Sequence, residues 1–80
     1  MRIIAMLRDL KKDEAGDWVI DFGKSPLVAY AETLRDRRDV IRRIARDKGW
    51  TTLEVEEALD SGASVNVVGK FHATEYRYTH

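Results

Sequence analysis

The sequence contains no cysteine, a single proline and only two histidines, and its apolar runs are short. Without cysteine the chain can form neither a disulfide nor a thiolate metal site, and a reducing, cytoplasmic setting is the expected one. A membrane-spanning helix needs roughly 20 apolar residues in a row, so we expect no membrane insertion. Charge returns at Arg8 and Asp9, too early for the apolar core of a signal peptide, which is therefore not expected either.

At 80 residues the chain is expected to form one domain, residues 1–80, because so short a chain has no room for a second core. Its 14 basic and 14 acidic side chains cancel, but they are not evenly spread. Residues 35–48 hold seven basic and three acidic side chains, whereas residues 51–64 hold four acidic and no basic ones. This separation of charge is the main functional indication in the sequence.

The middle of the chain is predicted to begin with a long helix. Ser25-Pro26 is typical of a helix start, since Ser can cap the first turn and Pro needs no hydrogen bond there. The helix is therefore expected over residues 27–48, with Gly49 as a left-handed cap at its end. Apolar residues at helical spacing predict its core face. These residues are Leu27, Tyr30, Ala31, Leu34, Ile41, Ile44 and Ala45.

A second helix is predicted over residues 51–60. Thr51 as the N-cap, with Glu54 three residues later, predicts a capping box, and Trp50 with Val55 predicts a hydrophobic staple across the same end. The dipeptide Ser61-Gly62 is expected to end this helix.

The two ends of the chain are expected to form an antiparallel sheet. Residues 17–23 alternate as a strand does. Residues 2–10 fit either a strand or a helical face, and we favour a strand that pairs with residues 17–23. Residues 65–68 predict a strand, and residues 71–78 continue the sheet after Gly69-Lys70, which is either a two-residue turn or a bulge. The expected order is β-β-α-α-β-β, an α+β domain with two helices packed on a small antiparallel sheet.

A short motif spans the two predicted helices. With Gly49 as the turn glycine, Ala45 at the small contact position and Trp50 as the apolar turn residue, residues 42–60 resemble the helix-turn-helix of DNA-binding regulators. The resemblance implies a second helix that enters the major groove and a wing over residues 65–78. The outward residues of that helix are acidic, and they would repel the phosphate backbone. We therefore expect a likeness of fold and not of DNA reading.

Two charged helical faces are the candidate binding sites. The candidate residues are Arg38, Arg42 and Arg46 on the first helix and Glu56, Glu57 and Asp60 on the second. Two alternatives stay open. The spacing of Arg35–Asp39, Asp39–Arg43 and Arg43–Asp47 predicts pairs within the first helix, which would leave Arg37, Arg38, Arg42 and Arg46 without a partner. Alternatively, the basic and acidic helices neutralise each other within the fold.

Nothing in the sequence indicates catalysis or a bound group. Ser61 or Ser64 could act as a nucleophile with His72 as its base, but the spacing of these residues does not predict the required geometry. The sequence contains no metal-ligand set and no glycine-rich phosphate loop, so we expect no enzyme, no metal and no cofactor. The aromatic residues of segment 71–78 alternate with basic ones, which offers the stacking of single-stranded bases as a further interpretation.

These observations favour a non-enzymatic protein-binding module that occludes a surface of a larger, nucleic-acid-handling complex through its charged helical faces. In size, autonomy and charge separation the chain resembles the single-domain inhibitors of phages and other mobile elements, such as anti-CRISPR proteins. That resemblance implies a protein or ribonucleoprotein partner and transfers no site residue. The alternative is a winged-helix-like DNA-binding transcriptional regulator, in which further basic residues bind DNA together with the arginines of the first helix. These residues are Arg37, Lys70 and Arg77.

Overall fold

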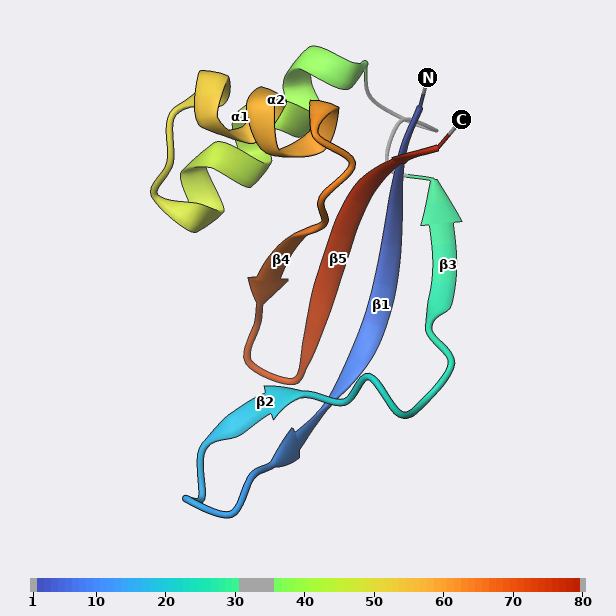
Figure 1. Cartoon of the computed structure of the whole chain (residues 1–80), viewed down its shortest axis with the longest axis vertical. Helices are drawn as coiled ribbons and strands as arrows, with labels where there is room; N and C mark the ends of the chain where they lie inside the picture. Colours follow the sequence, from blue (N-terminus) through green and yellow to red (C-terminus); the bar gives the residue numbers. More distant parts are fainter. Residues whose placement is uncertain (1, 31–35, 80) are drawn as a thin grey trace.

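The computed structural model describes residues 2–30 and 36–79, which form an antiparallel sheet and two helices (Figure 1). The elements are β1 (Arg2–Lys12), β2 (Trp18–Ile20), β3 (Leu27–Tyr30), α1 (Arg37–Lys48), α2 (Thr52–Asp60), β4 (Val65–Val68) and β5 (His72–Thr79). The α+β class, with two helices on a small antiparallel sheet, is confirmed. Within the described residues, no helix is long and apolar enough to cross a membrane.

The first strand is the centre of the sheet. β1 pairs with β5 on one side and with β2 and β3 along its length, and β4 completes the order β2-β1-β5-β4. The preference for a strand over residues 2–10 is therefore confirmed. The hairpin is confirmed too, but its second strand covers only Trp18–Ile20 of the expected residues 17–23. Leu10 pairs with Ile20, whereas Leu7 pairs with Leu27, so the register shifts by four residues between β2 and β3. The chain from Asp21 to Pro26 makes this excursion, which adds four residues between the two strands and is therefore longer than the one-residue insertion of a β-bulge.

The predicted start of the first helix at Ser25-Pro26 is wrong. Residues 27–30 form β3, and their backbone pairs with β1 from Ile4 to Leu7. Helix α1 begins later, after Asp36, whose carboxylate accepts a hydrogen bond from the backbone N–H of Asp39. The expected core positions Ala31 and Leu34 lie outside the described residues.

The residues that cap the helix ends are the ones that the sequence predicts. Gly49 adopts φ 70°, and its N–H reaches back to carbonyls of the last turn of α1, so the left-handed cap is confirmed. The side chain of Thr51 accepts from the N–H of Glu54, and Glu54 accepts from the N–H of Thr51, so the capping box is confirmed. Ser61 and Gly62 end α2 as expected.

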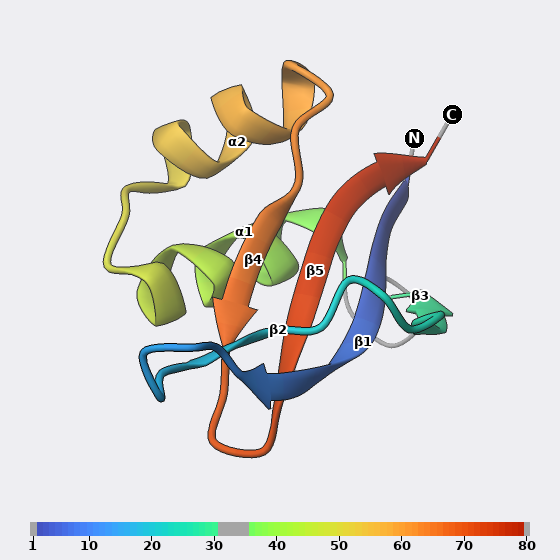
Figure 2. The ribbon, with the colours of Figure 1, turned by 60° about the horizontal axis from the view of Figure 1, so that its bottom comes forward.

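Both helices lie on one side of the sheet, near the ends of β1 and β5 where the two termini meet (Figures 1 and 2). The core between these layers consists of Ile3, Val40, Ile41, Ile44, Ala45, Val55, Leu59 and Val65. Tyr76 and Tyr78 pack against this core from β5. Burial raises the pKa of the Tyr76 hydroxyl. These two rings are therefore part of the fold and do not form a base-stacking platform with Phe71.

The C-terminal hairpin turns one residue later than Gly69-Lys70 predicts. Val68 pairs with Ala73, and the N–H of Gly69 donates to the carbonyl of His72. Lys70 and Phe71 thus form the tip, and the alternative of a bulge in one long strand is wrong. A Cβ on Gly69 would lie 2.8 Å from the His72 carbonyl oxygen, which explains why glycine occupies this position.

Candidate interaction surfaces of the two helices

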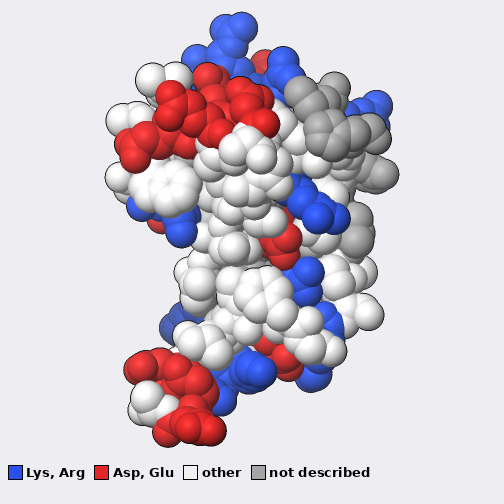
Figure 3. Space-filling model, in the orientation of Figure 1, with Lys and Arg blue, Asp and Glu red and all other residues white. Residues whose placement is uncertain are grey.

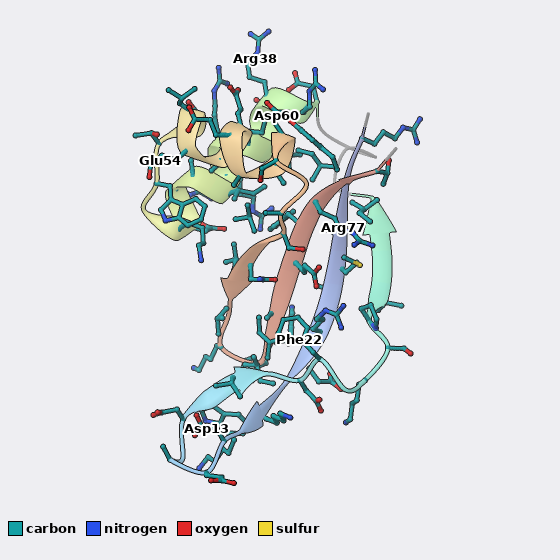
Figure 4. All side chains as sticks on the ribbon, in the orientation of Figure 1. Asp13, Phe22, Arg38, Glu54, Asp60 and Arg77 are labelled. Carbon is teal, nitrogen blue, oxygen red and sulfur yellow. The ribbon has the colours of Figure 1, made fainter. Side chains whose placement is uncertain are left out.

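Helix α2 turns a row of carboxylates away from the core. Val55 and Leu59 are fully buried, so the residues on the opposite side of this short helix face outward. We call this outward face the acidic surface; it consists of Leu53, Glu56, Glu57 and Asp60. All four are exposed, and the last turn carries no basic residue. Figure 3 shows the carboxylates gathered over α2, and Figure 4 labels Asp60 among them.

An apolar side chain lies within the acidic surface, and the sequence prediction did not include it. Leu53 is 61% exposed. Its spacing of three, four and seven residues from Glu56, Glu57 and Asp60 places all four on one helical face. The signal was present in the sequence, because Leu53 falls opposite Val55 and Leu59 on a helical projection.

Helix α1 presents the arginines. Arg38, Arg42 and Arg46, which we call the arginine row, are all exposed. They are four residues apart, so they are spaced by about 6 Å along the helix. Figure 4 shows Arg38 projecting away from the rest of the molecule.

The ion pairs on α1 differ from those predicted. The Arg43–Asp47 pair is present at 4.0 Å, but Asp39 pairs with Arg42 at 3.3 Å and not with Arg43. Arg46 approaches Asp47 at 3.6 Å, so the expectation that Arg42 and Arg46 lack partners is wrong. Residues three apart are also neighbours on a helix, which accounts for the Arg42–Asp39 pair, whereas Arg46 and Asp47 are adjacent in the sequence. The predicted Arg35–Asp39 pair lies outside the described residues.

The two charged helices do not neutralise each other through direct contacts. Arg38 and Glu56 line one shallow hollow of about 340 Å³ together with Arg37 and Ile41. Within residues 36–79, however, the ion pairs of the α1 arginines are all made with Asp39 and Asp47 of the same helix. Both surfaces therefore keep their charge available to a partner.

The further basic residues of the DNA-binding alternative lie on separate parts of the molecule. Arg37 is at the start of α1, and Lys70 is at the tip of the β4–β5 hairpin with its ammonium 5.5 Å from the Phe71 ring centre. Arg77 pairs with Ile4 and lies on β5 between the two tyrosines that face the helices, so it points to the other face of the sheet. Arg37 shares a hollow with Arg38, but the fold does not bring Lys70 and Arg77 onto one surface with the arginine row.

A buried polar network lies on the sheet face away from the helices, and the sequence did not reveal it. Arg8 Nε donates to Glu75 Oε1 at 2.7 Å, and Ser64 Oγ donates to Glu75 Oε2 at 2.7 Å. Glu75 is 7% exposed. Burial alone would raise the pKa of Glu75, but the hydrogen bonds from Ser64 and Arg8 and the Arg8 charge outweigh it and leave this pKa below its ordinary value.

The same arginine holds the excursion between β2 and β3. Arg8 Nη1 donates to the carbonyl of Lys24 at 3.4 Å, and the Phe22 ring lies 4.9 Å from the guanidinium carbon. Figure 4 shows Phe22 over the sheet. The excursion is thereby tied to the strands beneath it.

The serines considered for a nucleophile–base arrangement have other partners. Ser61 Oγ donates to the carbonyl of Ala58 at 2.7 Å, and Ser64 is bound to Glu75. His72 lies at the start of β5, in register with Asp9. The described residues therefore do not assemble the arrangement that the sequence allowed.

The geometry defines a small α+β domain with two oppositely charged helical surfaces. The chain matches no protein-family model, no curated protein and no solved structure. Its function has to be argued from these surfaces themselves.

Proposed function

We propose that the chain is a non-enzymatic protein-binding module, a small inhibitor or regulator that occludes a surface of a larger, nucleic-acid-handling complex. The acidic surface of α2 is its main contact. The observation that carries the proposal is the exposed Leu53 on the same helical face as Glu56, Glu57 and Asp60, at the N-terminal end of that face. In mode of action, such a module is of the anti-CRISPR kind.

The composition of the acidic surface is suited to a protein partner. Protein interfaces combine an apolar centre with a polar rim. Leu53 supplies an apolar contact at the start of the acidic surface, and the carboxylates that follow it along the helix supply polar contacts and select a basic partner. The partner surface that complements this arrangement has an apolar contact for Leu53 beside Lys and Arg side chains, and such positively charged side chains also line surfaces that bind nucleic acid.

The acidic surface is also held in place before binding. The Thr51–Glu54 capping box orders the first turn of α2, and Val55 and Leu59 anchor its inner face in the core. A surface that is already ordered loses little conformational entropy when it binds, which favours affinity.

The DNA-reading alternative has less support. The outward side chains of a recognition helix lie close to DNA phosphates. The outward face of α2 carries Glu56, Glu57 and Asp60, whose carboxylates repel phosphates. Lys70 and Arg77, which that alternative needs, lie away from the helices.

The test is an affinity capture with the tagged chain from a lysate treated with nuclease. The variant is Glu56→Lys with Glu57→Lys, which leaves the inner face of α2 untouched and places positive charge in its C-terminal half, where the helix dipole favours it. The control is Glu14→Lys with Asp17→Lys, which makes the same change of charge in the exposed β1–β2 turn.

We expect a stoichiometric protein partner that survives nuclease treatment, binds the control variant and is lost with the α2 variant. Leu53→Ala should weaken the same complex without a change of charge. Equal capture by all variants would rule out the acidic surface as the contact, and recovery of nucleic acid alone would replace the proposal with the regulator alternative.

A further inference from the structure

The arginines of α1 surround a hollow of their own. It measures about 420 Å³ and is lined by Asp39, Arg42, Arg43 and Arg46, all from this one helix. The three guanidinium-bearing side chains are 62%, 56% and 76% exposed. Three positive charges thus meet at one site, next to the two carboxylates of Asp39 and Asp47.

Most of the hydrogen-bonding capacity of these arginines is unused. Within the described part of the chain, the three donate a single side-chain hydrogen bond, from Arg42 Nη1 to Asp39 Oδ1 at 3.3 Å. Arg43 and Arg46 approach Asp47 only at ion-pair distances of 4.0 and 3.6 Å. Each guanidinium carries five N–H donors in a planar fork that suits phosphate oxygens.

The lining distinguishes this site from the acidic surface of α2. Among the residues that the structure describes, no apolar side chain lines the hollow, whereas Leu53 is exposed within the acidic surface. Protein interfaces have an apolar centre, but interfaces with nucleic acids are more polar and strongly positive. The arginine row also places one positive charge on each turn of the helix, about 6 Å apart. Such a line of charges suits the evenly spaced phosphates of a nucleic acid strand.

We infer that Arg42, Arg43 and Arg46 bind the phosphodiester backbone of a nucleic acid without reading its sequence. This contact goes beyond the proposed role of α2, because the hollow contains no α2 residue and needs no protein partner. Glu56 of α2 lies in the neighbouring hollow beside Arg38. Repulsion from that carboxylate directs the nucleic acid toward the Arg42–Arg46 end of α1.

The test measures fluorescence anisotropy of labelled single-stranded RNA, duplex RNA and duplex DNA titrated with the purified full chain at several salt concentrations. The variant is Arg42→Glu with Arg46→Glu. The control is Lys11→Glu with Lys12→Glu, which makes the same charge change at the exposed end of β1, away from the helices. Circular dichroism verifies folding, and Arg42→Gln with Arg46→Gln replaces the reversal if that variant does not fold.

We expect binding whose affinity falls linearly with salt on logarithmic axes, and a loss of about tenfold or more in the arginine variant, with a salt slope lower by about two for duplex. The lysine control should retain affinity within about threefold at moderate salt, where long-range charge effects are screened. Absence of binding at low salt, or equal losses in both variants, would overturn the inference. Competition by polyglutamate as effective as that by RNA would also overturn it and indicate an acidic protein. None of these outcomes depends on the capture of a protein by α2, so the two proposals fail separately.

Discussion

Arg8 and Glu75 join the two central strands, with Nε and Oε1 2.7 Å apart on the sheet face away from the helices. Glu75 also accepts a hydrogen bond from Ser64, and Arg8 also donates to the carbonyl of Lys24. This pair therefore connects the start of β4 with the excursion between β2 and β3. It gives the sheet face away from the helices a polar anchor beside the buried Met6 and Ala73.

Removal of the carboxylate should be costly. Glu75→Ala leaves Arg8, whose side chain is 15% exposed, without its partner, and we expect the free energy of unfolding to fall by about 3 kcal/mol. Urea denaturation measures this change. As the control, Lys24→Ala removes the exposed Lys24–Asp9 pair at 3.4 Å and should cost less than about 1 kcal/mol. Similar costs for the two variants would show that the Arg8–Glu75 pair is no stronger than a surface ion pair.

The same carboxylate should make stability depend on pH. The pKa of Glu75 is lower in the folded chain than its ordinary value of 4.5, so folding favours the charged form. Its contribution is present in full above that ordinary value and is lost as the pH falls through the folded pKa. Glu75→Gln should therefore be less stable than the parent at neutral pH, and the difference should shrink under acid conditions. Thermal unfolding over a pH series tests this, and a difference that stays constant would contradict it.

The local features of the fold were predictable from the sequence. Gly49, Thr51 and Glu54 act within one helical turn of their neighbours, so their spacing alone indicates the caps that the structure shows. The alternation of residues 2–10 was less decisive, because a strand and a helical face share several of its positions. Pairing with β5 decides in favour of the strand.

The remaining features depend on contacts between distant residues. Leu27 and Tyr30 are three apart, which fits a helix, but the backbone of this segment pairs with β1 and forms a strand. Arg8 and Glu75 are 67 residues apart, and neither has a local pattern that indicates the other. The charged helical residues were identified from the sequence. Leu53 was not included among them, although its place opposite Val55 and Leu59 in the helical pattern already indicated its exposure.

The turn between the helices should be sensitive to the replacement of Gly49, because of its backbone conformation and not because of space, since a Cβ there would meet no atom within 4 Å. Gly49 has φ 70°, which residues with a Cβ adopt at a cost, so Gly49→Ala should lower the free energy of unfolding by about 1 kcal/mol. Gly23→Ala is the control, because Gly23 does not have a positive φ and a Cβ there would meet only the flexible Asp21 side chain at 3.2 Å. Chemical denaturation of both variants makes the comparison. A cost for Gly23→Ala equal to that for Gly49→Ala would contradict the assigned role of the left-handed cap.

The capping box should support the acidic surface as well as the fold. Thr51→Ala removes the oxygen that accepts from the N–H of Glu54, and we expect a loss of about 1 kcal/mol in the free energy of unfolding. Thr52→Ala is the matched control, because Thr52 is exposed and lies inside the first turn, where its side chain does not cap the helix. Hydrogen exchange should show faster exchange at the amides of the first turn of α2 in Thr51→Ala only. Because Leu53 lies in that turn, the Thr51 variant should also bind an α2 partner more weakly than the Thr52 variant. Equal binding by both variants would show that the order of this turn does not contribute to the affinity of the acidic surface.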